Sequence, residues 1–351
     1  AVGVSAGKTS QGESATAIGY DAGFNAQGDY SVAMGYRAGC NTQGVNSTAI
    51  GREAAKANQE DNAVAVGAYA GYNAQGANAV AIGNLAGKVD QGNSSVAIGI
   101  STGETSQGNS SIAIGQNAGQ NQQGSTAIAI GYYAGSGDQA GSSIAIGQNA
   151  GQNSQGGNAV AIGLLAGKTQ QGDYTVAIGQ HAGSGDQGLG AVAIGRYAGE
   201  NSQASYAIAI GHEAGQTGQG GHGVAIGRLA GNTNDSNYAI CIGDSAGRDI
   251  GDTGGNLNVN IGHRAGEADP ASESVAIGYL AGYRALGDRM IALGKGALSG
   301  TVAHSDCIVL AGTGNTGGGG RWYTGVMRDA TGSEYVHYAG GELVRGNNYS
   351  D

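Results

Sequence analysis

The six histidines are the residues best suited to acid–base or metal chemistry, but their spacing supports neither. His181, His212 and His263 each follow a recurring glycine by one or two residues, in a variable position that we expect to face solvent. No cysteine or second histidine lies at metal-ligand spacing from any of them. The other three are equally isolated: His222, His304 and His337.

Cysteines and carboxylates give the same result. Cys40, Cys241 and Cys307 are far apart, and their odd number and irregular spacing predict neither a disulfide framework nor a metal site. The scattered carboxylates form no pair for general acid–base work: Asp138, Asp186, Glu200 and Glu213. Many Gly-x-x-Ala-Gly stretches resemble phosphate loops, but no Gly-Lys-Ser/Thr follows at the required spacing. We therefore expect no catalytic residue, no cofactor, no metal and no enzymatic activity.

Tyrosines are the one surface feature that could bind a ligand. Exposed tyrosine among Asn and Gln combines a flat apolar ring with a hydroxyl, which suits sugars and other polar surfaces. The alternative is that these rings only cover strand edges and glycine backbone. The candidates beside the recurring glycine are Tyr20, Tyr36, Tyr132, Tyr133 and Tyr197.

The element that positions all these residues is a sixteen-residue repeat. Its glycine recurs without a slip from Gly3 to Gly243 and, after a three-residue insertion, at Gly262, Gly278 and Gly294. A short and regular repeat predicts a solenoid in which each unit is one coil. We expect about nineteen coils over residues 1–300, and we expect residues 301–351 to form a separate β cap.

Each unit predicts two short strands and two turns. In Ala79-Val80-Ala81-Ile82-Gly83, Val80 and Ile82 point to one side of a strand and Ala81 to the other. The middle position is Ala in almost every unit, the exceptions being Cys241 and Asn260, which indicates close approach of two backbones. The glycine then turns the chain, because it adopts positive φ without steric cost.

A glutamine recurs eight residues after each glycine as far as Gln219. In register, the amides can bond to those above and below, as in the ladders of stacked parallel sheets. We interpret this row as structural, and it gives way to Asp235, Pro270 and Leu286 further on. The row includes Gln11, Gln27, Gln43, Gln75, Gln91, Gln107 and Gln123.

One such coil cannot bury both its Ala row and its Val/Ile row. One of these rows must pack against another molecule, and an identical chain is the simplest partner. A homotrimer closes three sheets around an axis, whereas a dimer could pair two sheets face to face. We favour the trimer, and the fold class is an all-β, parallel β-solenoid.

Composition excludes several other classes. The chain has 72 glycines but one proline and no Gly-X-Y period, which excludes collagen. Its formal net charge of -10 argues against a nucleic-acid partner. No apolar run is long enough to insert into a membrane.

The Ser-Val-Ala-Ile-Gly core at 95–99 and 274–278 resembles the head repeat of trimeric autotransporter adhesins. That resemblance covers residues 1 to about 300. It implies a trimeric left-handed parallel β-roll whose surface binds host molecules, a glycan or a protein receptor among them.

The C-terminal fifty residues resemble a different group. A strand with Trp322 and Tyr323, then a Tyr-rich strand with Tyr335 and Tyr338, then Gly-Glu-Leu-Val at 341–344 are similar to the segment before the endosialidase-type chaperone of phage and viral fibres. The Pro usual before Arg328 is missing. The resemblance implies that a chaperone followed Asp351 and was cleaved, and that these aromatic residues cap the trimer and set its register.

Together these features predict an extracellular structural fibre of a virus or phage, such as a tail fibre, that carries a host-attachment surface. The alternative is a trimeric adhesin of a bacterial cell surface, or a secreted filament. The coding sequence after Asp351 distinguishes the two: a chaperone domain indicates a fibre, and a coiled coil with a barrel indicates an adhesin.

Overall fold

The structure is a computed structural model that describes residues 1–233, 237–249, 257–268, 272–284 and 288–299, with the strand segments 308–311, 321–323, 327–328, 334–337 and 343–345. The chain divides into two compact units, Ala1–Asp186 and Gln187–Asp351. The described residues contain strands and turns but no helix. The expected parallel β-solenoid is confirmed, with about 17 turns against the nineteen coils counted in the sequence.

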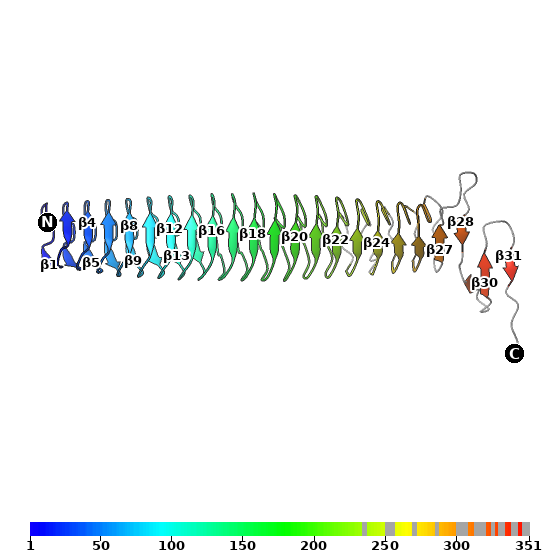
Figure 1. Cartoon of the computed structure of the whole chain (residues 1–351), viewed down its shortest axis with the longest axis horizontal. Coiled ribbons are helices and arrows are strands. Elements are labelled where there is room, and N and C mark those ends of the chain that lie inside the picture. Colours follow the sequence, from blue (N-terminus) through cyan, green and yellow to red (C-terminus); the bar gives the residue numbers. More distant parts are fainter. Residues whose placement is uncertain are drawn as a thin grey trace, which may run out of the picture. The chain divides into compact units, whose positions relative to one another are not determined.

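The first unit is a stack of coils with two parallel sheets (Figure 1). The aliphatic sheet contains the three residues before each recurring glycine, and successive strands pair in register, as Val80 does with Val96 and Ala81 with Ala97. Its strands are β2 (Thr16–Ile18), β4 (Val32–Met34), β6 (Thr48–Ile50), β8 (Val64–Val66), β10 (Val80–Ile82), β12 (Val96–Ile98), β14 (Ile112–Ile114), β16 (Ile128–Ile130), β17 (Ile144–Ile146), β18 (Val160–Ile162) and β19 (Val176–Ile178).

The second sheet of this unit, the glutamine sheet, ends each strand on the recurring glutamine. Its strands are β1 (Thr9–Gln11), β3 (Asn25–Gln27), β5 (Asn41–Gln43), β7 (Ala57–Gln59), β9 (Asn73–Gln75), β11 (Val89–Gln91), β13 (Thr105–Gln107) and β15 (Asn121–Gln123). Beyond β15 the expectation of two strands per coil is wrong. The pairing is reduced to single bridges between successive glutamines, from Gln123 to Gln139, from Gln139 to Gln155 and from Gln155 to Gln171. The change begins where Gly137, a poor strand former, enters the sheet.

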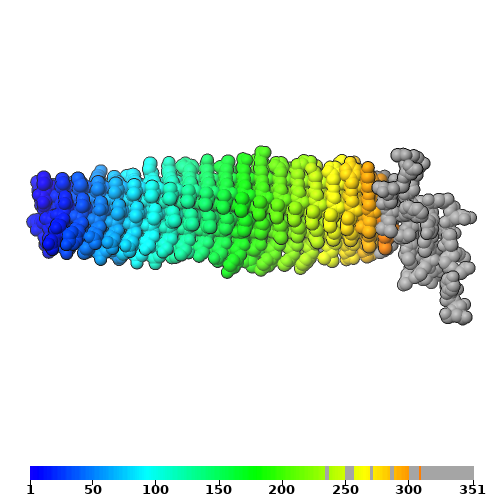
Figure 2. Space-filling model, viewed as in Figure 1, coloured from blue at the N-terminus to red at the C-terminus, as the bar shows by residue number. Residues whose placement is uncertain are grey.

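The interior of each coil is very thin. Ala81 and Ala129 are fully buried between the two sheets, whereas the residues on either side of them in the strand face outward. A Cβ added to Gly135 would lie 3.3 Å from the Cβ of Ala129, which confirms the close approach of two backbones. Figure 2 shows each coil of this unit as one layer of side chains.

The recurring glycine is required at the corner for two reasons. Gly19 has a φ of 131°, a conformation that other residues rarely adopt. A Cβ on Gly19 would also lie 2.5 Å from the carbonyl oxygen of Gly35 in the next coil. Stacking at the sheet spacing of about 4.8 Å leaves no room for a side chain there.

The second unit continues with the same repeat. Parallel strands pair in register from β20 to β27, and β27 pairs antiparallel with β28, where Leu310 lies opposite Trp322. These strands are β20 (Val192–Ile194), β21 (Ile208–Ile210), β22 (Val224–Ile226), β23 (Ile240–Ile242), β24 (Val259–Ile261), β25 (Val275–Ile277), β26 (Ile291–Leu293), β27 (Ile308–Ala311) and β28 (Arg321–Tyr323).

A small antiparallel sheet follows. It contains β29 (Met327–Arg328), β30 (Glu334–His337) and β31 (Leu343–Arg345), with Tyr335 in β30. Tyr338 lies outside the described residues, as do Asp235, Pro270, Leu286, His304 and Cys307. The boundary at residue 300 and the role of 301–351 as a cap stay predictions.

Candidate binding and assembly surfaces

The recurring glutamines form a buried row inside the coils. Gln27, Gln43, Gln75, Gln91, Gln107 and Gln123 are at most 2% exposed, and Gln11 at the end of the row is half-buried. Each amide nitrogen crosses the coil to the aliphatic sheet: Nε2 of Gln91 donates to the carbonyl of Val80 at 2.9 Å. The same bond closes the coil at Gln107 and Gln123. The long amide side chain therefore links the two sides of its coil through a buried hydrogen bond.

Bonds also run between coils. Nε2 of Gln107 donates to Oε1 of Gln123 at 3.2 Å, and Nε2 of Gln123 donates to Oε1 of Gln139 at 3.1 Å. Gln59 and Gln75 are joined in the same way at 2.9 Å. The structure thus shows an amide ladder in segments, because Oε1 of Gln27, Gln43 and Gln91 has no hydrogen-bond partner. Its atoms are too buried to meet a ligand.

A second glycine makes room for this row in most repeats. A Cβ on Gly119, whose φ is 52°, would lie 2.8 Å from Oε1 of Gln123. In the repeat of Gln59, Ala55 replaces this glycine and has a φ of 44°.

Asn260 shows how the chain builds a coil without that glutamine. It occupies the Ala slot of β24 and is 2% exposed. A Cβ on Gly266 would collide with Oδ1 of Asn260, so this amide lies against the second glycine as glutamine does elsewhere. In sequence Asn260 looked like a mere exception; the missing glutamine of the same repeat was the signal that could have revealed its role.

The outer face of the aliphatic sheet is an apolar surface of the first unit. Its residues alternate with the buried alanines, and Ile82 is 39% and Ile50 38% exposed. In-register pairing aligns them in two rows, one through Val80, Val96 and Ile112 and one through Ile82 and Ile98. Parallel sheets are normally covered on both faces, which makes this face a candidate interaction surface.

The tyrosines do not form one patch. Tyr20 and Tyr36 stack with ring centroids 5.6 Å apart, and their side chains are 51% and 45% exposed. Tyr132 meets Tyr133 edge to face at 4.5 Å, several coils further along the unit. Of the expected residues, the structure therefore brings together two separate pairs.

Tyr197 lies in the second unit and is half-buried. The guanidinium of Arg196 lies 4.7 Å from its ring centroid, and His212 approaches edge-on at 6.4 Å. Tyr206, His222 and Tyr238 form a second stack, with centroids 5.2 and 5.1 Å apart. His222 looks isolated in the sequence because its partners, Tyr206 and Tyr238, lie sixteen residues away on either side.

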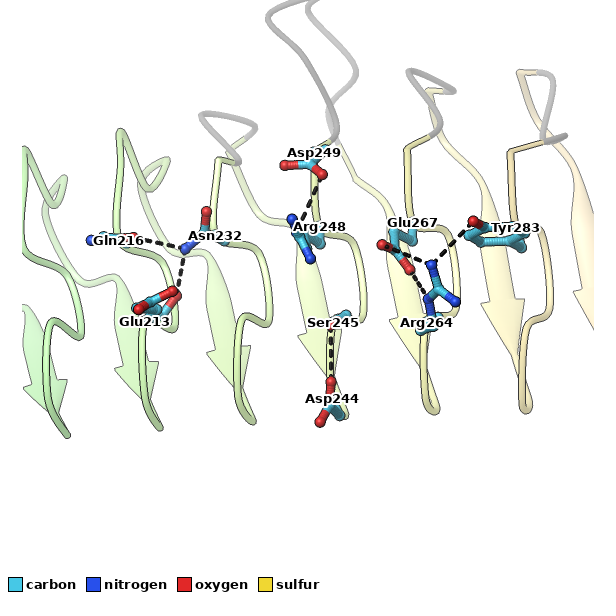
Figure 3. A network of polar contacts seen from close by, with 10 residues as sticks. All are labelled: Glu213, Gln216, Asn232, Asp244, Ser245, Arg248, Asp249, Arg264, Glu267 and Tyr283. Atoms are coloured by element: carbon cyan, nitrogen blue, oxygen red, sulfur yellow. Dashed lines mark hydrogen bonds and ion pairs between the residues drawn. The ribbon is translucent and has the colours of Figure 1, made fainter.

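Polar side chains of the second unit pair along the coils (Figure 3). Nδ2 of Asn232 donates to Oε1 of Gln216 at 3.0 Å. Arg264 binds Glu267 and donates to the hydroxyl of Tyr283 at 3.1 Å. These contacts satisfy the hydrogen-bonding groups of the side chains and link neighbouring coils.

Two titratable groups have shifted pKa values with clear causes. Burial alone would raise the pKa of Asp244, but hydrogen bonds from Ser245 and Arg228 outweigh it and lower that pKa. Burial raises the pKa of the Cys40 thiol, and nearby Arg37 opposes the shift only in part. A thiol with a raised pKa is a poor nucleophile.

In the part of the chain that the structure describes, no group of three or more His, Cys, Asp and Glu side chains could hold a metal ion. Likewise, none of the described segments forms a helix of the length and apolarity that crossing a bilayer requires.

Two stretches of the chain match the model of the YadA head domain repeat, residues 10–38 and 43–70. No curated protein and no solved structure matches the chain. The two matched stretches lie in the first coils, which contain both sheets and the glutamine row. They support an adhesin-like β-roll and an extracellular surface protein.

Proposed function

We propose that this chain is a non-enzymatic subunit of a homotrimeric surface fibre that attaches its carrier to a host. The observation that carries the proposal is the outer face of the aliphatic sheet, whose in-register strands align apolar side chains along the first unit, with Thr16 and Thr48 as the polar exceptions. Three such faces can bury one another around a common axis. The match to head repeats of the YadA type supports the same assembly.

Oligomeric state in solution tests the proposal. Light scattering should give three times the chain mass for the native protein. Ile82→Glu with Ile98→Glu places charges in the aliphatic face and should yield monomers or aggregates, because burying an unpaired charge is costly. Asn121→Glu, exposed in the glutamine sheet, is the matched control and should leave the trimer intact. A stable native monomer would contradict the proposal.

The carrier has two candidates, each favoured by one observation. The match to YadA head repeats favours a bacterial cell surface. The resemblance of residues 321–344 to the segment before fibre chaperones favours a virion, where the chain would be a tail fibre. Sequencing the coding region after Asp351 separates them: a chaperone domain supports the virion, and a coiled coil with a barrel supports the bacterial surface.

Register is a further part of the proposal. Coils of identical design can slip past one another by sixteen residues at little cost, so a unique segment must align the three chains. Residues 301–351, with Trp322, Tyr323, Tyr335 and Tyr338, are the long non-repetitive stretch. Truncation after Gly300 should give polydisperse assemblies, whereas deleting residues 111–126 should give a trimer shorter by one coil. Uniform trimers from the truncated chain would remove this role.

A further inference from the structure

Tyr20 and Tyr36 form a stacked pair in the first coils. They directly follow the corner glycines Gly19 and Gly35, so they occupy the same slot of neighbouring coils. Their ring planes are inclined by 12°, and their centroids lie 5.6 Å apart. This separation lies within the range of offset-stacked rings, so the two phenols lie side by side with their faces partly overlapping.

The backbone keeps the two rings in this register. The N–H of Arg37 donates to the carbonyl of Tyr20 at 2.9 Å, which joins the two coils beside the tyrosine slot. The guanidinium of Arg37 lies 3.9 Å from the carboxylate of Asp21, an ion pair between the same two coils. It lies 6.0 Å from the ring centroid of Tyr36, and the carboxylate offsets its charge. The rings are therefore held next to each other before any reaction begins.

Both rings are exposed, so an oxidant in solution can reach them. The cysteines that the structure describes, Cys40 and Cys241, are buried. Met34 on the outer face of β4 is exposed as well. A thioether is oxidised by gaining an oxygen atom, however, and cannot form a cross-link in that way. The stacked phenols are thus the exposed groups of these coils that can form a covalent bond to each other on oxidation.

The pair Tyr69–Tyr72 is equally close but differs in its surroundings. Its rings are tilted by 53° with centroids 5.8 Å apart, and both are half-buried. The guanidinium of Arg52 lies 5.3 Å from the ring centroid of Tyr69, and the ammonium of Lys56 lies 4.9 Å from that of Tyr72. A cation is attracted by the electrons of the ring below it. Removing one of those electrons weakens this attraction, so these two rings are harder to oxidise.

Two further groups of tyrosines have the wrong arrangement for a link between coils. Tyr132 and Tyr133 meet edge to face, but they are neighbours within one coil. In the second unit His222 lies between Tyr206 and Tyr238, with centroids 5.2 and 5.1 Å from its own. The imidazole therefore separates these two phenols.

We propose that Tyr20 and Tyr36 are a site of oxidative cross-linking, at which a peroxidase and hydrogen peroxide join them as dityrosine. Each phenol loses one electron and one proton, and the resulting radical shares its unpaired electron with the ring carbons beside the hydroxyl-bearing carbon. A carbon–carbon bond forms between one such carbon of each ring. The hydrogen on each bonded carbon then moves as a proton to the phenolic oxygen. The two electrons and two protons removed at first reduce one hydrogen peroxide to two water molecules.

The fold favours this reaction because the two radicals couple without a diffusional encounter. The bond closes a loop of residues 20–36, and such a loop lowers the entropy of the unfolded chain, as a disulfide does. An extracellular surface, which the match to head repeats supports, is a place where peroxide and peroxidases act. The bond lies within one chain, so it forms in a monomer as well as in a trimer and does not depend on the proposed assembly.

Peroxidase and hydrogen peroxide, applied to the full native chain, test the site. Dityrosine fluorescence should appear while the protein still runs as a single chain on a denaturing gel. After cleavage beside Asp21 and Asp29, the peptides of Tyr20 and Tyr36 should stay joined, with a mass two hydrogens below their sum. Fragmentation should exclude Tyr30, which lies in the same peptide as Tyr36. A small ruthenium photo-oxidant repeats the measurement without the bulk of the enzyme.

Tyr36→Phe keeps the ring but removes the phenol. It should lower the fluorescence at least about tenfold, because coupling then requires an encounter between separate molecules. Tyr132→Phe is the matched control, since Tyr132 occupies the same slot of a later coil and is equally exposed. Its fluorescence should equal that of the native chain. No dityrosine with either oxidant, equal losses in the two variants, or bonds that join two chains instead of Tyr20 to Tyr36 of one chain would overturn the inference.

Discussion

The coils of the first unit and the coil of β24 share the same backbone path, but different side chains fill their interiors. In the first unit the space beside the second glycine is filled by a glutamine from the far side of the coil, as Gln123 fills it beside Gly119. In the coil of β24, Asn260 fills it from the strand itself. In these coils an amide fills the same place, and either side of the coil can supply it.

A related exchange occurs in the next coils. Met290, Leu298 and Val309 are buried there with a cluster of alanines, so the interior of these coils contains larger apolar residues. The corner glycines do not change between the two regions: Gly262 has a φ of 129° and Gly278 of 135°. Glycine geometry and the thin Ala strand are the constant parts of the design, and the polar filling is the variable part.

The largest effect should come from removing one amide of the glutamine row. Gln123→Ala deletes the bond to Ile112 and both ladder bonds, to Gln107 and Gln139. Each buried group left unpaired costs about 1–3 kcal/mol in the free energy of unfolding. Chemical denaturation measures the loss, with Gln148→Ala, exposed at a corner, as the control. Equal stability of the two variants would mean that the ladder contributes nothing.

Overfilling the interior should cost somewhat less. Ala129→Leu inserts three carbons against Gly135 and Gln139, where the space is already closed. Overpacking of this kind costs about 1–3 kcal/mol per chain. The matched change Gln148→Leu adds the same side chain at an exposed position and should stay within about 0.5 kcal/mol of native. Thermal unfolding compares the two, and identical melting temperatures would refute the assigned facing of the strand.

Much of this architecture follows from the sequence, because each of its features has a period. Alternation around Ala81 predicted that it lies on the opposite side of the strand from Val80 and Ile82, and the period of sixteen predicted parallel, in-register pairing. The role of Asn260 could not be read in the same way. A single departure from a repeat has no periodicity to reveal its role, and only a second departure in the same repeat, the missing glutamine, gives a signal.

Removing the buried amide should destabilise the coil of β24 less than it destabilises a coil of the first unit. Asn260→Ala removes the amide beside Gly266 and its contact with the sulfur of Cys241 at 3.9 Å. We expect a loss of about 1 kcal/mol, the value of one ordinary hydrogen bond. Glu273→Ala, exposed in the following turn, should change stability by less than half as much. A loss as large as that of Gln123→Ala would show that the two amides are equally essential.

The smallest expected effect comes from transferring the asparagine of the β24 coil into a coil of the first unit. This change tests most directly whether the two interiors are interchangeable. Ala113 in β14 occupies the slot of Asn260, and its coil also contains Gly119 and Gln123. Ala113→Asn in the native chain crowds the amide of Gln123 and should therefore lower the stability of the protein. In the Gln123→Ala background the same change should recover stability, because the new amide can occupy the space beside Gly119. A double-mutant cycle should give a favourable coupling of at least about 0.5 kcal/mol. Additive effects would mean that Asn260 is tolerated in β24 for a reason of its own, and that the two interiors are not interchangeable.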